Sequence, residues 1–447
     1  MRENTFKMKI IIPHAHIINP DEFFRADICI ENGKISSLES PGTLLDTEDA
    51  KIVQTGGVFV LPGSIDPHVH LSLETPAGLS ADDILSGSDA ALAGGVTHIM
   101  DFVTPLRGQS LTKALEKKIS ETQYYASVGL SFHMGISGWL PDMEQQMEIC
   151  VKEYGIKSFK VYLAYRENIG IGYEELEKIM KISARLGTIL LVHAEEHEMI
   201  ENLQKEFLEK GQTEPKYHAL SRPPKSESTA IKKVINLVKE THCKTYFVHI
   251  SSAESAHLIA EAKKESLPVY AETCPQYLIF DDSVYEGSFE KTAPYVFSPP
   301  VRPKQHRELL WQHLHDGTFD TIATDHCPFT MEQKMAGRDN FTLIPNGAGG
   351  LEFRIPLLFH YAVLQEKFSL QQWIKLCTSN AAEIFGLKEE GKIAPGADAN
   401  IVFFNPVKQH TLTAAKQAQQ CDINIYEGLT VRGHVEKVFY KGEKVII

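Results

Sequence analysis

The feature that most constrains the fold is an alternation of short apolar runs with helical stretches through the middle of the chain. Apolar runs separated by amphipathic stretches are typical of repeated βα units around parallel strands. Eight such runs occur, at residues 58–61, 96–103, 128–134, 157–163, 188–192, 244–250, 268–272 and 321–325. Helices are expected between them, over residues 111–126, 143–154, 173–186, 228–240 and 253–264. Eight units predict an α/β fold built on a (β/α)8 TIM-like barrel.

The two chain ends have a different pattern from the middle. Residues 9–12 and 26–30 are short strand-like segments next to turn-forming residues, and residues 399–404 and 437–446 are again typical of strands and a hairpin near the C-terminus. We therefore expect one discontinuous β-sandwich domain from residues 1–57 and 390–447, with the barrel at 58–389. Two independent β flaps are the alternative interpretation.

Charge and hydropathy narrow the class of partner. The 447 residues carry 45 basic and 58 acidic side chains, a formal charge of -13, which argues against nucleic acid or an anionic membrane as the main partner. Residues 1–7 lack the apolar core of a signal peptide, and no apolar run approaches the roughly 20 residues of a membrane helix. We expect a cytoplasmic protein with a small-molecule substrate.

Side chains that can bind metal stand at the ends of several expected strands. Active sites of this barrel form where the carboxyl ends of the strands meet. The ends of five runs carry His68 and His70, Lys160, His193, His249 and Asp325. His68 and His70 would point the same way, because side chains alternate along a strand. One histidine in such a place is usually structural, but five strands that supply ligand-type residues together indicate a metal site.

The sequence around these residues resembles a known family. The relevant stretches are residues 62–70 (PGSIDPHVH), 158–165 (SFKVYLAY), 192–195 (VHAE), 248–251 (VHIS) and 324–327 (TDHC). They are similar to the cyclic amidohydrolases of the amidohydrolase superfamily, above all to the hydantoinase and dihydropyrimidinase branch. The resemblance runs in order along nearly the whole chain.

The resemblance implies two divalent metal ions, usually zinc. His68, His70 and Asp325 would hold one ion, and His193 and His249 the other. Lys160, carboxylated on its side-chain amine, would bridge them. An ordinary lysine, with a pKa of about 10.4, is a cation that two dications would repel. Apolar neighbours favour the neutral amine that carbon dioxide needs. Without the resemblance, however, a solvated strand-end lysine is the favoured interpretation of Lys160.

The resemblance also implies the reaction. A hydroxide shared by the two metals would open a cyclic amide, a hydantoin- or dihydropyrimidine-type ring, with Asp325 as the proton carrier. The Tyr165 hydroxyl would donate to the developing oxyanion, whereas a lone tyrosine is more often a packing residue. Ser298 and Asn346 lie in stretches where related enzymes hold the amide edge of the ring through backbone groups, so both are expected substrate contacts. Residues 328–350 have no clear periodicity and are expected to form a lid or binding loop.

Three other functions stay open. Dihydroorotases carry an arginine two residues after the second histidine, where this chain has Ser72, so a ring with a carboxylate lacks its main anchor here. Allantoinase, which opens a ureide ring, is a second alternative. Non-catalytic adaptors related to dihydropyrimidinase have lost metal ligands, whereas all six ligand positions are filled here.

Several further expectations follow for single segments. Residues 71–79 lack the Gly-Gly-Thr common in hydantoinases, which puts the exocyclic substituent of the substrate in doubt. His133 and Glu272 are interpreted as barrel wall, and His14, His16, His306 and His434 as surface residues. A homo-oligomer, a dimer or tetramer, is the family expectation.

Overall fold

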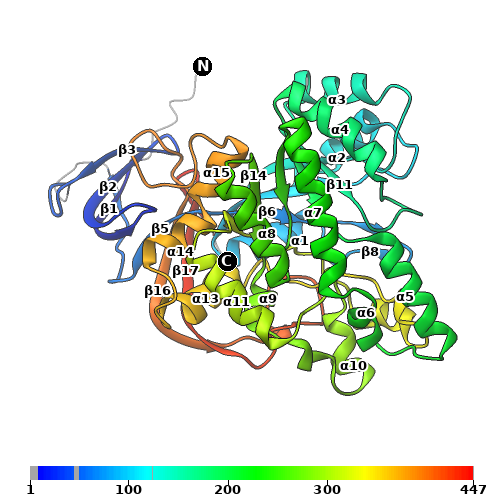
Figure 1. Cartoon of the computed structure of the whole chain (residues 1–447). Coiled ribbons are helices and arrows are strands. Elements are labelled where there is room, and N and C mark those ends of the chain that lie inside the picture. The colour runs from blue at the N-terminus through cyan, green and yellow to red at the C-terminus, as the bar shows by residue number, and fades with distance from the viewer. Residues whose placement is uncertain (1–8, 45–49, 123, 446–447) are drawn as a thin grey trace.

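Eight parallel strands from the middle of the chain form the barrel that carries the site (Figure 1). The computed structural model describes residues 9–44, 50–122 and 124–445. The barrel strands are, in sheet order, β6 (Ser64–Val69), β9 (Val96–Val103), β10 (Gly129–Gly135), β11 (Ser158–Tyr162), β12 (Ile189–His193), β13 (Lys244–Phe247), β14 (Val269–Thr273) and β15 (Thr321–Ile322). A parallel bridge between Val69 and His326 closes the ring. The predicted (β/α)8 barrel is confirmed.

Helices cover the outside of the barrel. They are α1 (Ile84–Ala93), α2 (Leu111–Thr122), α3 (Met143–Lys152), α4 (Tyr173–Leu186), α5 (His197–Glu209), α6 (Lys216–Ser221), α7 (Pro224–Thr241), α8 (Ala253–Lys264), α9 (Pro275–Ile279), α10 (Phe289–Thr292), α11 (Lys304–His315), α12 (Met331–Lys334), α13 (Arg354–Leu358), α14 (Leu370–Cys377) and α15 (Ser379–Phe385). The helix α4 has the expected bounds because its apolar face, Leu176, Ile179 and Met180, is buried, and Gly187 ends it in the left-handed conformation.

The chain ends meet in a second sheet beside the barrel, where Figure 1 shows the blue and the orange to red strands together. Its strands are β1 (Lys9–Ile18), β2 (Phe23–Glu31), β3 (Lys34–Glu39), β4 (Ala50–Ile52), β5 (Phe59–Pro62), β16 (Ile401–Thr411), β17 (Thr430–Tyr440) and β18 (Glu443–Val445), and a separate hairpin joins β7 (Glu74–Thr75) to β8 (Gly78–Leu79). Strand β5 pairs with both β1 and β16, so the two ends form one unit instead of two flaps.

The first barrel strand lies later than the sequence pattern suggested. Residues 58–61 were expected in the barrel, but β5 belongs to the chain-end sheet, where Val402 pairs with Leu61. The break at Pro62 and Gly63 separates the two sheets, and the barrel begins with β6. An apolar β-branched run fits either sheet equally well, so the pattern could not choose its partner. The residue limits of the two domains stay a prediction.

The described helices also bear on the membrane question. None of them combines the length and the apolar character that crossing a bilayer requires. Residues 1–7, where the sequence was searched for a signal peptide, lie outside the described residues.

Candidate active site

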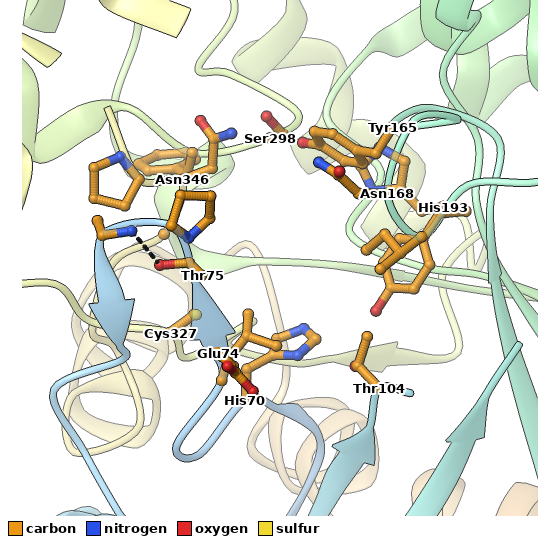
Figure 2. A pocket seen from close by; sticks show the side chains of 18 of the residues that line it. His70, Glu74, Thr75, Thr104, Tyr165, Asn168, His193, Ser298, Cys327 and Asn346 are labelled. Atoms are coloured by element: carbon orange, nitrogen blue, oxygen red, sulfur yellow. Dashed lines mark hydrogen bonds between the residues drawn. The ribbon is translucent and has the colours of Figure 1, made fainter. Parts of the chain in front are cut away.

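A cavity of about 720 Å³ opens at the carboxyl ends of the barrel strands. Five of the six predicted metal ligands and all three predicted substrate contacts line it: His70, Lys160, His193, His249, Asp325, Tyr165, Ser298 and Asn346. His68, the sixth, is fully buried below them. Figure 2 shows His70, His193, Tyr165, Ser298 and Asn346 around this cavity. Residues spread over almost 280 positions of the sequence thus share one wall.

Three ligand-type atoms converge at the end of β6. The Nε2 atoms of His68 and His70 lie 3.2 Å apart, as the alternation along a strand predicts. Asp325 Oδ1 lies 3.0 Å from His68 Nε2 and 3.3 Å from His70 Nε2. Burial lowers the pKa of His68, but Glu272 and Asp325 outweigh burial and raise it to about 9. The position therefore favours a positive charge, which a bound cation would also supply.

A second pair of imidazoles faces the same cavity. His193 Nδ1 and His249 Nε2 lie 3.0 Å apart, and the ring centres of His249 and His68 lie 5.4 Å apart. Burial lowers the pKa of His193, and it lowers the pKa of His249 well below the usual value. Both rings are neutral at pH 7, which is the form of histidine that binds metal.

Lys160 has the burial and the lack of partners that a modified lysine needs. Its side chain is completely buried, and its Nζ has no hydrogen-bond partner among the described residues. The Nζ lies 5.0 Å from the ring centre of Phe102 and 5.0 Å from that of Tyr162. Burial lowers the pKa of Lys160 to about 7, so a large fraction is neutral amine near neutral pH. The residues present therefore fit both a metal pair and a carbamate between them.

The three predicted substrate contacts come from two loops and the end of another strand. Tyr165 is partly buried and contacts Ser298, and the centre of its ring lies 4.9 Å from the Arg222 guanidinium. Burial raises the pKa of Tyr165, which keeps its hydroxyl protonated as a hydrogen-bond donor. The Asn346 side-chain oxygen is buried without a hydrogen-bond partner in the described part of the chain. An unpaired amide oxygen beside a cavity is a ready acceptor for a ligand N–H.

Backbone strain coincides with the site. Tyr165, His249 and Asp325 have φ angles of 58°, 41° and 53°, in the left-handed region that residues with side chains rarely adopt. Such a conformation costs roughly 1–3 kcal/mol and persists where the surrounding structure imposes it. These three residues are aimed at the cavity by loops that leave β11, β13 and β15.

Two carboxylates that orient the histidines were not predicted as site residues. Glu272, interpreted from the sequence as barrel wall, accepts hydrogen bonds from His68 Nδ1, from the His249 backbone N–H at 3.1 Å and from the Tyr246 hydroxyl at 2.7 Å. Glu195 lies 2.9 Å from His193 Nε2. A carboxylate that binds one ring nitrogen fixes the tautomer and leaves the other nitrogen free for a metal. The strand-end rule that selected the histidines also covers Glu272.

The remaining histidines divide between the two expectations made for them. His133 is a buried wall residue, since its ring nitrogens contact Ser158 Oγ and, at 2.9 Å, the Pro67 carbonyl. His14 is exposed, as expected. His306 was expected at the surface, but it is only 4% exposed and accepts a hydrogen bond from the Ala253 backbone N–H. His306 lies in the first turn of α11, and its sequence neighbours gave no sign that Ala253, 53 residues earlier, would pack against it.

Comparison with known proteins agrees with the geometry. The Amidohydrolase family model matches residues 59–445. A D-hydantoinase of Geobacillus stearothermophilus is 36% identical over 98% of this chain and 93% of its own length. A dihydropyrimidinase of Dictyostelium discoideum is 35% identical over 95% of this chain and 84% of its own. The crystal structure of dihydropyrimidinase from Brevibacillus agri NCHU1002 superposes with a TM-score of 0.95 at 35% identity, covering 98% of this chain and 95% of that one. The chain belongs to the amidohydrolase family, in the branch that contains the hydantoinases and dihydropyrimidinases.

Proposed function

We propose that this protein is a metal-dependent cyclic amidohydrolase that opens uncharged hydantoin- or dihydropyrimidine-type rings in the cavity at the barrel mouth. The observation that carries the proposal is the convergence of six side chains from the ends of five strands at the barrel mouth, five of them on the cavity wall and His68 buried next to them. Three ligand atoms of His68, His70 and Asp325 lie within 3.3 Å of one another, beside the His193 and His249 pair. Such a set of nitrogen and oxygen donors suits zinc.

The proposed metal ligands form two groups. His68, His70 and Asp325 would hold one divalent ion, and His193 and His249 would hold the second. Lys160, as the carboxylated lysine, would contribute an oxygen to each. Bound there, two divalent ions would polarise the amide carbonyl and lower the pKa of a nearby water. Carboxylation would also remove the cost of burying an amine without a partner.

Protons and the oxyanion are handled by the side chains around the ring. The Asp325 carboxylate faces the cavity and can accept a proton from the attacking water and return it to the departing ring nitrogen. The Tyr165 hydroxyl would donate to the oxygen of the attacked carbonyl as negative charge develops on it. Ser298 and Asn346 would hold the amide edge of the ring, and the unpaired oxygen of Asn346 would accept a ring N–H.

The charges of the cavity argue for an uncharged ring. Among the described residues that line it, Arg107 is the cationic side chain besides Lys160. Its guanidinium already donates hydrogen bonds of 2.5 Å to the carbonyl oxygens of Arg166 and Gly170. Ser72, where a dihydroorotase carries arginine, is outside the lining. A substrate carboxylate would therefore compete with these carbonyls for Arg107, while Glu74 and Glu167 at the wall would repel it.

A substrate panel tests the proposal. The protein, purified with zinc and bicarbonate in the medium, is assayed for ring opening of hydantoin, 5-substituted hydantoins, dihydrouracil, allantoin and dihydroorotate. We expect the fastest turnover with a hydantoin or dihydrouracil, and none from an Asp325→Asn variant. A dominant rate with dihydroorotate would contradict the proposal, and one with allantoin would reassign the substrate.

Light scattering of the same sample tests the inferred dimer or tetramer.

A further inference from the structure

A buried lysine outside the metal cluster binds the loop that follows the last barrel strand. Lys334, the last residue of α12 (Met331–Lys334), is 1% exposed. Its Nζ donates to three backbone carbonyls: Val296 at 2.8 Å, Pro345 at 2.7 Å and Gly347 at 2.8 Å. An ammonium group has three N–H donors, so these three carbonyls satisfy it completely.

The carbonyls flank the two proposed contacts for the amide edge of the ring. Pro345 and Gly347 stand on either side of Asn346, and Val296 lies two residues before Ser298. A backbone hydrogen bond of 3.1 Å from the Gly347 N–H to the Val296 carbonyl joins the same two segments. Lys334 is therefore a hydrogen-bonding side-chain link between two loops that are almost 50 residues apart in sequence and face one cavity.

The turn at Asn346 has little freedom of its own. Gly347 has a φ of 153°, and a Cβ atom at this position would lie 2.2 Å from the Cys327 carbonyl oxygen. The backbone at Gly347 is therefore pressed against the strand end that carries Asp325. A displacement of the Pro345 or Gly347 carbonyl would move the Asn346 side chain relative to Asp325.

Burying this amine costs desolvation free energy, which argues that Lys334 does more than fill space. The partners that the described residues offer to Lys334 Nζ are carbonyl oxygens and no carboxylate, and burial lowers the pKa of Lys334 to about 7. The three carbonyl oxygens favour the charged form. A leucine or methionine would fill the same space without the cost of desolvation.

We infer that Lys334 is a positioning residue for ring binding: it fixes the Ser298 and Asn346 loops at the distance from each other that the amide edge of the substrate requires. This inference rests on the proposed function. Lys334 acts through the backbone, and its side chain is not among the residues that line the cavity.

Lys334→Met tests the inference in the full chain loaded with zinc. The methionine keeps most of the apolar stem and removes all three donors. We expect KM for both hydantoin and dihydrouracil to rise about tenfold or more, with kcat changed about threefold at most and the metal content unchanged. Lys334→Gln, with two N–H donors on a shorter side chain, is expected to give a smaller rise in KM.

Lys263→Met is the matched control. Lys263 is partly buried and pairs with Asp320 at 2.6 Å, at the end of the barrel where β15 begins, away from the cavity. Its loss is expected to lower the unfolding temperature and leave KM unchanged. The inference is overturned if Lys334→Met has a wild-type KM, if it loses metal, or if neither Lys334 variant folds, because Lys334 would then support the whole barrel. An inactive wild-type protein would instead refute the proposed function.

Discussion

Lys160 is the residue whose chemistry decides whether two metals can share this cavity. Its buried Nζ has no hydrogen-bond partner among the described residues, and as an ammonium it would repel two cations. We predict that Lys160→Ala loses both metal ions and ring-opening activity, and that short carboxylic acids restore part of the activity by replacing the carbamate oxygens. Metal analysis and rate assays measure this, with the exposed Lys205→Ala as the control. A fully active Lys160→Ala enzyme would rule out the carbamate.

Tyr165 carries the proposed oxyanion contact. Replacing it with phenylalanine removes only the hydroxyl and keeps the packing against Arg222. We predict that Tyr165→Phe lowers kcat by about 10²–10³-fold with its metal content intact, the loss typical of one oxyanion donor. The control is Tyr173→Phe. The Tyr173 hydroxyl donates to Glu196, the residue before α5, and Tyr173 does not line the cavity. Equal kcat values for Tyr165→Phe and the wild type would assign Tyr165 to packing alone.

Glu195 links stability to pH. Burial raises its pKa, but the Arg222 guanidinium, 2.5 Å away, acts together with His193 and Arg302 to outweigh burial and hold the pKa at about 2. The ionised form is thus favoured in the folded state, which is worth on the order of 3 kcal/mol at pH 7. This stabilisation is present above the unfolded pKa of about 4.5 and is lost as the pH falls toward 2.

The corresponding variant is Glu195→Gln. We predict a lower unfolding temperature than wild type at pH 7, because Arg222 is left buried without its counter-charge. The difference should shrink as the pH falls from about 4.5 toward 2, since the unfolded wild-type chain binds a proton on Glu195 in this range whereas the folded protein does not. Thermal melts across this pH range measure the difference. A gap that stays constant down to pH 3 would show that the charge of Glu195 is not what stabilises the fold.

At the residue level, the sequence predicted the positions of the ligand-type side chains better than their partners. His68 and His70 follow from alternation along a strand, and the short distance between their Nε2 atoms agrees with it. The contact between His68 and Glu272 joins residues 204 positions apart, so no local sequence pattern predicts it. Glu195 lies in one of the resembling stretches, but only the folded chain shows that it contacts Arg222.

At the level of elements, strand lengths were harder to predict than strand positions. The helices α4 and α8 have the expected bounds. The strand β13 ends at Phe247 and β15 at Ile322, several residues before the ends of the apolar runs. The chain leaves the sheet there and places His249 and Asp325 in left-handed conformations, which apolar patterning does not encode.

The short helix α12 also contacts the β7–β8 hairpin, which lines part of the cavity. The Gln333 side-chain NH2 donates to the Leu79 carbonyl at 2.7 Å and the Ala77 carbonyl at 3.3 Å, while its oxygen accepts from the Thr330 backbone N–H and caps the helix. Residues 73–77 of this hairpin line the cavity. Gln333 thus connects α12 to the loop expected to face the exocyclic substituent.

Gln333→Glu removes the donor and keeps the capping oxygen. We predict that this variant changes the relative kcat/KM values among 5-substituted hydantoins by about tenfold, because the hairpin is released, and changes unsubstituted hydantoin by about twofold at most. Glu332→Gln, at the exposed neighbouring position, is the control. A uniform change for every substrate would show that the hairpin does not select the substituent.

At the level of the whole molecule, the alternation of apolar runs and helices was sufficient to predict the barrel, and the two β-rich ends to predict a shared sheet. The alternation did not predict the sheet to which residues 58–61 belong. Residues 59–61 of this run fall in β5, which pairs with strands from both ends of the chain. That pairing places the chain-end sheet directly before β6, the strand that leads to His68 and His70.

The central claim is that the barrel mouth holds a pair of divalent ions, and counting them tests it most directly. Wild-type protein, expressed with zinc and bicarbonate and freed of loose metal, is analysed for bound metal per chain. Two groups of ligand atoms, one from His68, His70 and Asp325 and one from His193 and His249, predict about two ions per chain. A value below about one ion per chain would contradict the account.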